Sequence, residues 1–231
     1  MPTTSSQTSP RLSRRADGIA LAVWVLVAAL FVALGFAVQA SGGVDPDVFY
    51  EYDTAEQALV NNAVFIGVTL AIAAVLGRPL AELGIRSFSW GWLWRALSLI
   101  AVVLVLAGIL EPLLHPGREQ GLAPDVWRPN RAGAFALNAV VASTLVPFAE
   151  ELFFRGLGVR VLLPFGGLAA AGITALAFGL GHGVLVALPI LVPFGLVLGW
   201  VRWRSNSVWP GVIAHGSYNG VALLVLYLRL A

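Results

Sequence analysis

The chain has 231 residues, of which 58% are hydrophobic and 11% charged, with a formal charge of +2 and a mean hydropathy of +0.85. A water-soluble domain carries about a quarter of its residues as charged side chains. The composition therefore excludes an ordinary soluble domain, and the small net charge gives no support for nucleic-acid binding. The sequence has no cysteine, which excludes disulfides, thiolate metal sites and a cysteine nucleophile.

Long apolar runs without period-two alternation favour membrane helices over a β-barrel. We therefore predict an all-α, polytopic membrane bundle, with membrane lipids but no nucleic acid among its partners. Residues 1–17 are polar and rich in Ser, Thr and Pro, and are predicted to form a disordered cytosolic tail. The uncharged run from Ile19 to Val38 is long enough to cross a bilayer as a helix. It exceeds the roughly 7–15 residues of a signal-peptide core, which favours an uncleaved span over a signal peptide.

Six further apolar runs bring the expected number of transmembrane helices to about seven. In chain order they cover residues 58–77, 90–110, 132–149, 161–180, 183–201 and 208–228. Trp90, Trp92 and Trp94 are typical of an anchor at the level of the lipid headgroups. With the N-terminus in the cytosol, nine arginines lie on the inside and four on the outside of the membrane, which favours that orientation.

Ionisable residues within apolar helices are costly and usually functional. Here they gather in the C-terminal half of the chain. Glu150 and Glu151 end one apolar run and are followed by Arg155, His182 closes the next run, and His215 lies inside the last.

The two adjacent glutamates are predicted to differ in role. Glu151 precedes Arg155 by four residues, which is the favourable order for an ion pair on a helix. Glu150 is turned about 100° away from Glu151 and has no arginine at helical spacing on its C-terminal side. A structural clamp accounts for Glu151 and Arg155, whereas Glu150 is a candidate proton acceptor.

The two histidines have partners at the same four-residue spacing. The ring of Phe178 would brace His182, while His215 and Asn219 would place an imidazole and an amide on one helix face. Either histidine, taken alone, could serve only to form a hydrogen bond between two helices. Together with Glu150 they supply what peptide hydrolysis needs, namely a base to activate water and donors for the oxyanion.

At these positions the sequence resembles the CPBP family of intramembrane proteases, which includes the type II CAAX prenyl endopeptidases and the Abi, or bacteriocin-immunity, proteins. The resemblance lies in E-E-L-F-F-R at 150–155, F-G-L-G-H at 178–182 and H-G-S-Y-N at 215–219. Any one of these motifs is weak, but three in order on successive apolar helices are specific. The chain accordingly divides into the tail (1–17), N-terminal transmembrane helices and loops (18–131) and a CPBP-like catalytic core (132–231).

The resemblance implies an intramembrane endopeptidase that acts on a peptide or a lipid-anchored protein. The implied catalytic residues are Glu150, His182, His215 and Asn219, and the implied supporting residues are Glu151, Arg155 and Phe178. Glu150 with His182 would activate water, and His215 with Asn219 would stabilise the oxyanion.

The cofactor is left open by the residue types. Glu150, His182 and His215 form a possible two-His, one-carboxylate zinc set, but they equally provide a base and donors without metal, which is the preferred expectation. The alternative functions are a non-catalytic scaffold or immunity-type relative, and a proton-coupled transporter. The complete set of motifs favours the enzyme, and the lack of broken helices in corresponding halves argues against the transporter.

Overall fold

The computed structural model describes residues 10–42, 45, 47–115, 124 and 126–230, and only the backbone of residues 10–16. All regular structure in these residues is helical, which confirms the predicted fold class. The longer helices are α1 (Pro10–Ala40), α2 (Tyr52–Val75), α3 (Trp90–Leu114), α5 (Ala132–Glu150), α7 (Gly167–Gly181), α8 (Leu188–Ser205) and α9 (Trp209–Leu230). A π-helix, η3 (Glu151–Gly158), and the short α6 (Val159–Leu162) continue α5 without a break. Single 3₁₀ turns occupy η1 (Val48–Tyr50), η2 (Pro129–Arg131), η4 (Leu163–Phe165) and η5 (Leu185–Ala187).

Six helical stretches of the described chain are long and apolar enough to cross a membrane, so the protein is a multi-pass membrane protein. They cover residues 17–40, 52–75, 90–114, 129–165, 185–205 and 209–230. The seventh expected span, predicted at 161–180, is instead the 15-residue helix α7. At 1.5 Å per residue α7 is about 22 Å long, short of the ~30 Å apolar core of a bilayer. The helical segment before α7 ends at Phe165 because Gly166 adopts a φ of 103°. The first residues of the predicted run therefore belong to that preceding segment.

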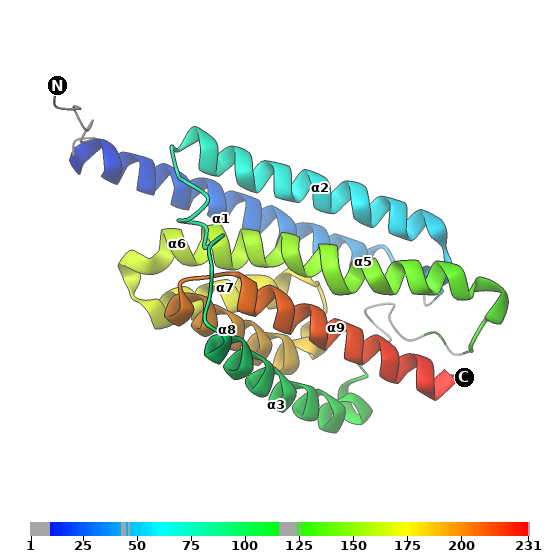
Figure 1. Cartoon of the computed structure of the whole chain (residues 1–231). Coiled ribbons are helices and arrows are strands. Elements are labelled where there is room, and N and C mark those ends of the chain that lie inside the picture. Colours follow the sequence, from blue (N-terminus) through cyan, green and yellow to red (C-terminus); the bar gives the residue numbers. More distant parts are fainter. Residues whose placement is uncertain (1–9, 43–44, 46, 116–123, 125, 231) are drawn as a thin grey trace.

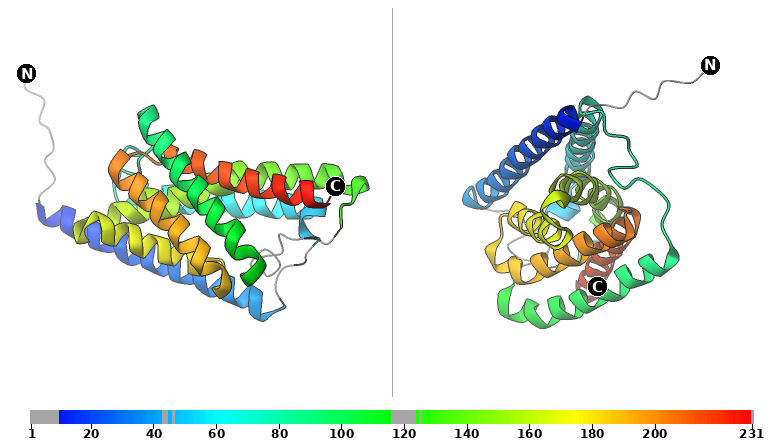
Figure 2. Two further views of the ribbon diagram at one scale, coloured as in Figure 1. Left: turned by 90° about the horizontal axis from the view of Figure 1, so that it is seen from below. Right: turned by 90° about the vertical axis from the view of Figure 1, so that its left-hand side faces the viewer.

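The continuous helix formed by α5, η3 and α6 lies in the centre of the bundle, as the end-on view shows (Figures 1 and 2). Helices α2 and α9 pack along α5, while α7 and α8 form a closely packed pair. Helix α1 lies along α7, and α3 crosses both α8 and α9. All eight residues of η3 are buried because the helices around it cover it from several sides. The acidic motif at 150–155 is therefore shielded by the rest of the bundle.

Helix α1 approaches the end of α7 through glycines. Gly183 has a φ of 71°, a conformation that favours glycine, and a Cβ atom there would overlap the carbonyl oxygen of Gly35 in α1. A Cβ atom on Gly35 would in turn overlap the carbonyl of Gly181. The turn that holds His182 is thus in direct backbone contact with α1.

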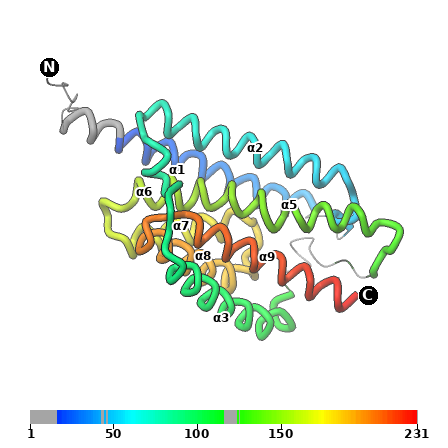
Figure 3. Tube along the Cα trace, in the orientation of Figure 1, coloured from blue at the N-terminus to red at the C-terminus, as the bar shows by residue number. Residues whose placement is uncertain are grey.

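At one end of the bundle the α2–α3 connection, residues 76–89, crosses from α2 to α3 over the central helices (Figure 3). Leu83 of this loop is fully buried, and its carbonyl would lie 3.0 Å from a Cβ atom on Gly156 of η3. Arg78 pairs with Asp17 of α1 and with Glu82. The loop is thereby fastened both to α1 and to the helix that carries the acidic motif.

At the opposite end the segment before α2 is fastened to α5. The buried Asn138 donates hydrogen bonds to the carbonyls of Phe49 and Glu51, at 3.1 and 2.8 Å. Arg131 pairs with the Glu51 carboxylate at 3.2 Å. Aromatic side chains close this end, namely Phe49, Tyr50, Trp127, Phe135 and Tyr227. The part of the acidic loop next to α2, at Phe49 and Glu51, is therefore held by α5.

Candidate active site

The crossing of α5 and α9 is fixed just before the acidic motif. Pro147 lies inside α5 and lacks the N–H that would bond the carbonyl of Ser143 one turn back. Helix α9 approaches at this point through Gly216, where a Cβ atom would overlap the Ser143 carbonyl. One turn further along α9, the Asn219 amide donates to the Ala142 carbonyl at 2.8 Å. These contacts hold His215, the neighbour of Gly216, against the start of η3.

Glu151 connects the site to a buried cation. Its Oε1 accepts a hydrogen bond from Arg155 Nη1 at 2.9 Å, and both side chains are fully buried. Arg155 Nη2 also donates to the carbonyl of Gly195 in α8, at 3.2 Å. The predicted ion pair within the motif is therefore present, and it ties η3 to α8.

His215 lies between the two adjacent glutamates. Its Nδ1 is 3.2 Å from Glu151 Oε1, and its Nε2 is 3.6 Å from Glu150 Oε2. Nδ1–H therefore donates to Glu151, and the Nε2 edge of the ring faces Glu150. The sequence predicted that Glu150 points away from Glu151, but the two carboxylates reach opposite edges of one imidazole.

Solvent reaches the two carboxylates unequally. The Glu150 side chain is 12% exposed, whereas that of Glu151 is fully buried. Within the described part of the chain, atom Oε2 of Glu151 has no hydrogen-bond partner, and a Cβ atom on Gly211 of α9 would lie 3.0 Å from it. Glu150 is thus the carboxylate with access to water, while Glu151 is locked within the bundle.

The ring of Phe178 lies at the centre of the site. It contacts His182 and His215 edge-on, with ring centroids 4.8 and 5.7 Å apart. The guanidinium group of Arg155 lies over the same ring, 4.5 Å from its centroid. Phe178 therefore packs against side chains from all three motifs.

His182 is oriented by its own helix. Its Nδ1 lies 2.9 Å from the Phe178 carbonyl, and since a carbonyl can only accept, Nδ1 carries the hydrogen. Neutral His182 then has its lone pair on Nε2, which is the form required of a base. His182 follows the last residue of α7. Because α7 is too short to cross the membrane, its end lies inside the bundle rather than at the membrane surface.

The possible zinc set is not assembled. Among the residues that the structure describes, no three His, Cys, Asp or Glu side chains are grouped as metal ligands. Glu150 and His215 are adjacent, but His182 does not complete a triad with them. The observed arrangement therefore does not fit the ligand set that the residue types allowed.

Sequence reasoning missed the second aromatic wall of the site. Phe194 of α8 packs edge-on against His215, with centroids 4.8 Å apart, and stacks on Phe178 at 5.8 Å. No motif marks Phe194. Pro147 and Gly216 mark the place where α5 and α9 cross. Neither residue indicates a crossing until the position of the other helix is known.

The comparisons with known proteins agree with the motifs. Residues 132–221 match the family model described as "Type II CAAX prenyl endopeptidase Rce1-like". No curated protein and no solved structure matches the chain. The matched segment includes η3, the end of α7 and the part of α9 that carries His215 and Asn219. Over residues 132–221 the chain is therefore similar to the Rce1-like type II CAAX prenyl endopeptidases.

Proposed function

We propose that the protein is an intramembrane endopeptidase that hydrolyses a peptide bond with water activated by Glu150 and His182. The observation that carries this proposal is the bridging of His215 by Glu150 and Glu151 within the family-matched segment. A buried structural clamp needs only the Glu151–Arg155 pair. It does not require a second, partly exposed carboxylate on the other side of an oriented imidazole.

In the proposed reaction, Glu150 and His182 orient a water molecule and Glu150 accepts its proton as the oxygen attacks the scissile carbonyl carbon. The resulting oxyanion accepts a hydrogen bond from Asn219, whose amide has a second N–H besides the one that bonds Ala142. His215 donates a second hydrogen bond from Nε2 in the form of the ring that carries a hydrogen on both nitrogens. When the intermediate collapses, the C–N bond breaks and the proton passes from Glu150 to the leaving amine. The products are a free carboxylate and a free amine.

Glu151 and Arg155 act as positioning residues in this scheme. Glu151 holds the imidazole of His215 through Nδ1, and Arg155 stabilises the negative charge of Glu151. The rings of Phe178 and Phe194 restrict the rotation of His215. Atom Nε2 is thereby directed toward Glu150 before any substrate binds, which lowers the cost of reorganisation in the transition state.

A groove beside the site supports a substrate with an apolar segment. It has a volume of about 730 Å³ and lies between α5 and α9, lined mainly by apolar surface around Phe148, Trp209 and Ile213. Phe148 precedes Glu150 by two residues, and Gly216 of the same groove follows His215 directly. We propose that a peptide or lipid-anchored protein approaches along this groove, with the N-terminus of the enzyme in the cytosol.

The test is a comparison of membrane proteomes from cells with the wild-type protein and with Glu150→Gln. We expect at least one membrane-protein fragment to disappear with Glu150→Gln while the variant accumulates at the wild-type level. Glu111→Gln is the matched control, because this partly exposed carboxylate lies at the far end of α3. Fragments that persist with Glu150→Gln would favour a non-catalytic scaffold or immunity-type function.

A further inference from the structure

The end of the bundle covered by the α2–α3 loop has an excess of positive charge. Four arginines lie in or against this loop, namely Arg78, Arg86, Arg160 and Arg202, and the carboxylates that pair with them are Asp17 and Glu82. Glu82 Oε2 is shared by Arg78 and Arg160, at 3.0 and 3.1 Å. Within the described part of the chain, Arg86 and Arg202 form no salt bridge. Four cations therefore face two carboxylates.

Arg202 places one of these charges beneath the surface. It is 2% exposed, and its Nη2 and Nη1 donate to the Glu82 carbonyl and to Asn206 Oδ1, at 3.0 and 3.2 Å. Its buried Nε has no hydrogen-bond partner among the residues that the structure describes. The neutral acceptors bond Nη1 and Nη2 but do not cancel the charge, so Arg202 maintains a positive potential under the loop.

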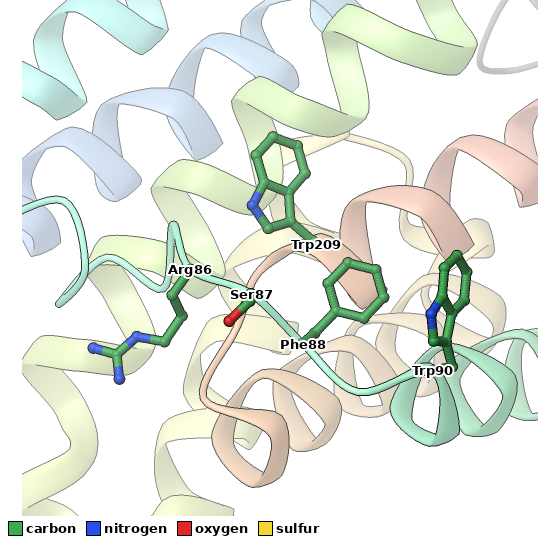
Figure 4. Close-up of a pocket in the computed structure, with 5 residues that line it drawn as sticks. All are labelled: Arg86, Ser87, Phe88, Trp90 and Trp209. Atoms are coloured by element: carbon green, nitrogen blue, oxygen red, sulfur yellow. The ribbon is translucent and has the colours of Figure 1, made fainter.

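Arg86 carries the second unpaired charge at the surface. It is exposed, and its guanidinium group donates to the carbonyl of Ala81 in the same loop. Figure 4 shows the guanidinium group of Arg86 extending away from Phe88, Trp90 and Trp209, although all of them line the same hollow of about 400 Å³. The positive charges of Arg86 and Arg160 both repel that of Arg202.

Tryptophans place this arginine cluster at headgroup depth. Six of the eight tryptophans lie in residues 90–94 and 200–209, namely Trp90, Trp92, Trp94, Trp200, Trp203 and Trp209. Trp92 packs on Trp200 with centroids 5.4 Å apart, and Trp90 and Trp94 are 70% and 66% exposed. Such aromatic belts mark the membrane–water interface. The surplus positive charge therefore lies at the level where the phosphates of the bilayer are found.

We propose that this end of the bundle binds the phosphate group of an anionic phospholipid, with Arg86 and Arg160 as its contacts and Arg202 as a fixed charge beneath them. A phosphodiester accepts hydrogen bonds from guanidinium groups and offsets the unpaired charge. A zwitterionic headgroup would bring its own cation against the same cluster, so a net anionic lipid is preferred. The ligand is a bilayer lipid rather than free phosphate, because the site lies at headgroup depth.

The test is native mass spectrometry of the full-length protein titrated with phosphatidylglycerol or phosphatidylcholine. We expect phosphatidylglycerol to bind in preference, its binding to weaken with salt, and Arg86→Gln to weaken it about fivefold. Arg229→Gln is the matched control, because Arg229 is 63% exposed in the last turn of α9 and 3.9 Å from Glu111. It should leave lipid binding unchanged.

Three results would overturn the proposal. They are equal binding of the two lipids by the wild type, equal losses with Arg86→Gln and Arg229→Gln, and displacement of phosphatidylglycerol by excess inorganic phosphate. The last would assign the site to free phosphate. Thermal unfolding in phosphatidylcholine checks that Arg86→Gln is folded, and Arg160→Gln repeats the test if it is not.

Discussion

Replacement of Glu151 by glutamine removes a charge from the most deeply buried part of the site. Glu151 and Arg155 are both fully buried, and the carboxylate also accepts from His215. Loss of one partner of a buried pair typically costs about 3–5 kcal/mol, because the other charge is left uncompensated. Glutamine keeps the shape and one acceptor oxygen, so we expect the low end, about 3 kcal/mol. For a chain of this size that corresponds to a fall of about 6–12 °C in the unfolding temperature.

The adjacent substitution Glu150→Gln should behave in the opposite way. The Glu150 side chain is partly exposed, and its 3.6 Å contact with His215 is longer than a normal hydrogen bond. We expect an unfolding temperature within about 2 °C of the wild type or slightly above it, because glutamine keeps the shape of the side chain and removes a charge that is costly to bury. Activity should fall about 100-fold or more, because the proton acceptor is lost.

A third variant separates charge from packing. Glu151→Gln combined with Arg155→Met removes both members of the pair, so it should unfold at a higher temperature than Glu151→Gln alone. Thermal unfolding in detergent and turnover, normalised to folded protein, are measured for all three variants. If Glu150→Gln unfolds the protein and Glu151→Gln is stable and inactive, the two roles are reversed. If both single variants are stable and active, the protease assignment fails.

Three further predictions test topology, metal and packing. With the N-terminus in the cytosol, a membrane-impermeant thiol reagent outside the cell should label Asp47→Cys but not Ser205→Cys in this cysteine-free chain, and the reverse pattern would invert the orientation. Purified protein should keep its activity after dialysis against a strong chelator, whereas stoichiometric zinc that is lost in His215→Ala would establish a metal mechanism. Gly183→Ala should destabilise the protein by about 2–4 kcal/mol through its positive φ and its overlap with α1. Gly172→Ala in α7, with nothing within 4 Å of its Cβ position, should be neutral or slightly stabilising, and equal effects of the two substitutions would refute the packing argument.

The helical membrane fold could be predicted because the apolar runs are long and nearly free of charge. Their boundaries could not. Hydropathy separates the runs at 132–149 and 161–180 at the charged motif between them, yet the chain remains helical through that motif. The polar groups of Glu151 and Arg155 are satisfied by each other and by α8, so the helix has no need to end at the charges.

The pairing of residues within one helix could also be predicted, since it depends only on spacing. Glu151–Arg155 and Phe178–His182 are both examples. The bridging of both glutamates by His215 depends on how α9 crosses α5, which no local pattern encodes. The π-helical geometry of residues 151–158 is likewise a tertiary outcome, because its wider turn has no distinctive sequence signal.

The glycine contact between α1 and the end of α7 has a consequence for biosynthesis. Gly35 and Gly183 are about 150 positions apart, so at ~5–20 residues per second the ribosome needs about 7–30 s to synthesise the intervening chain. During that interval α1 resides in the bilayer without the neighbour that its glycine surface fits. Because Gly183 directly follows His182, the histidine reaches its final depth only when the first and the fifth apolar helices of the chain meet. A chaperone or translocon subunit that retains α1 would therefore govern how much of the newly made protein acquires a complete site.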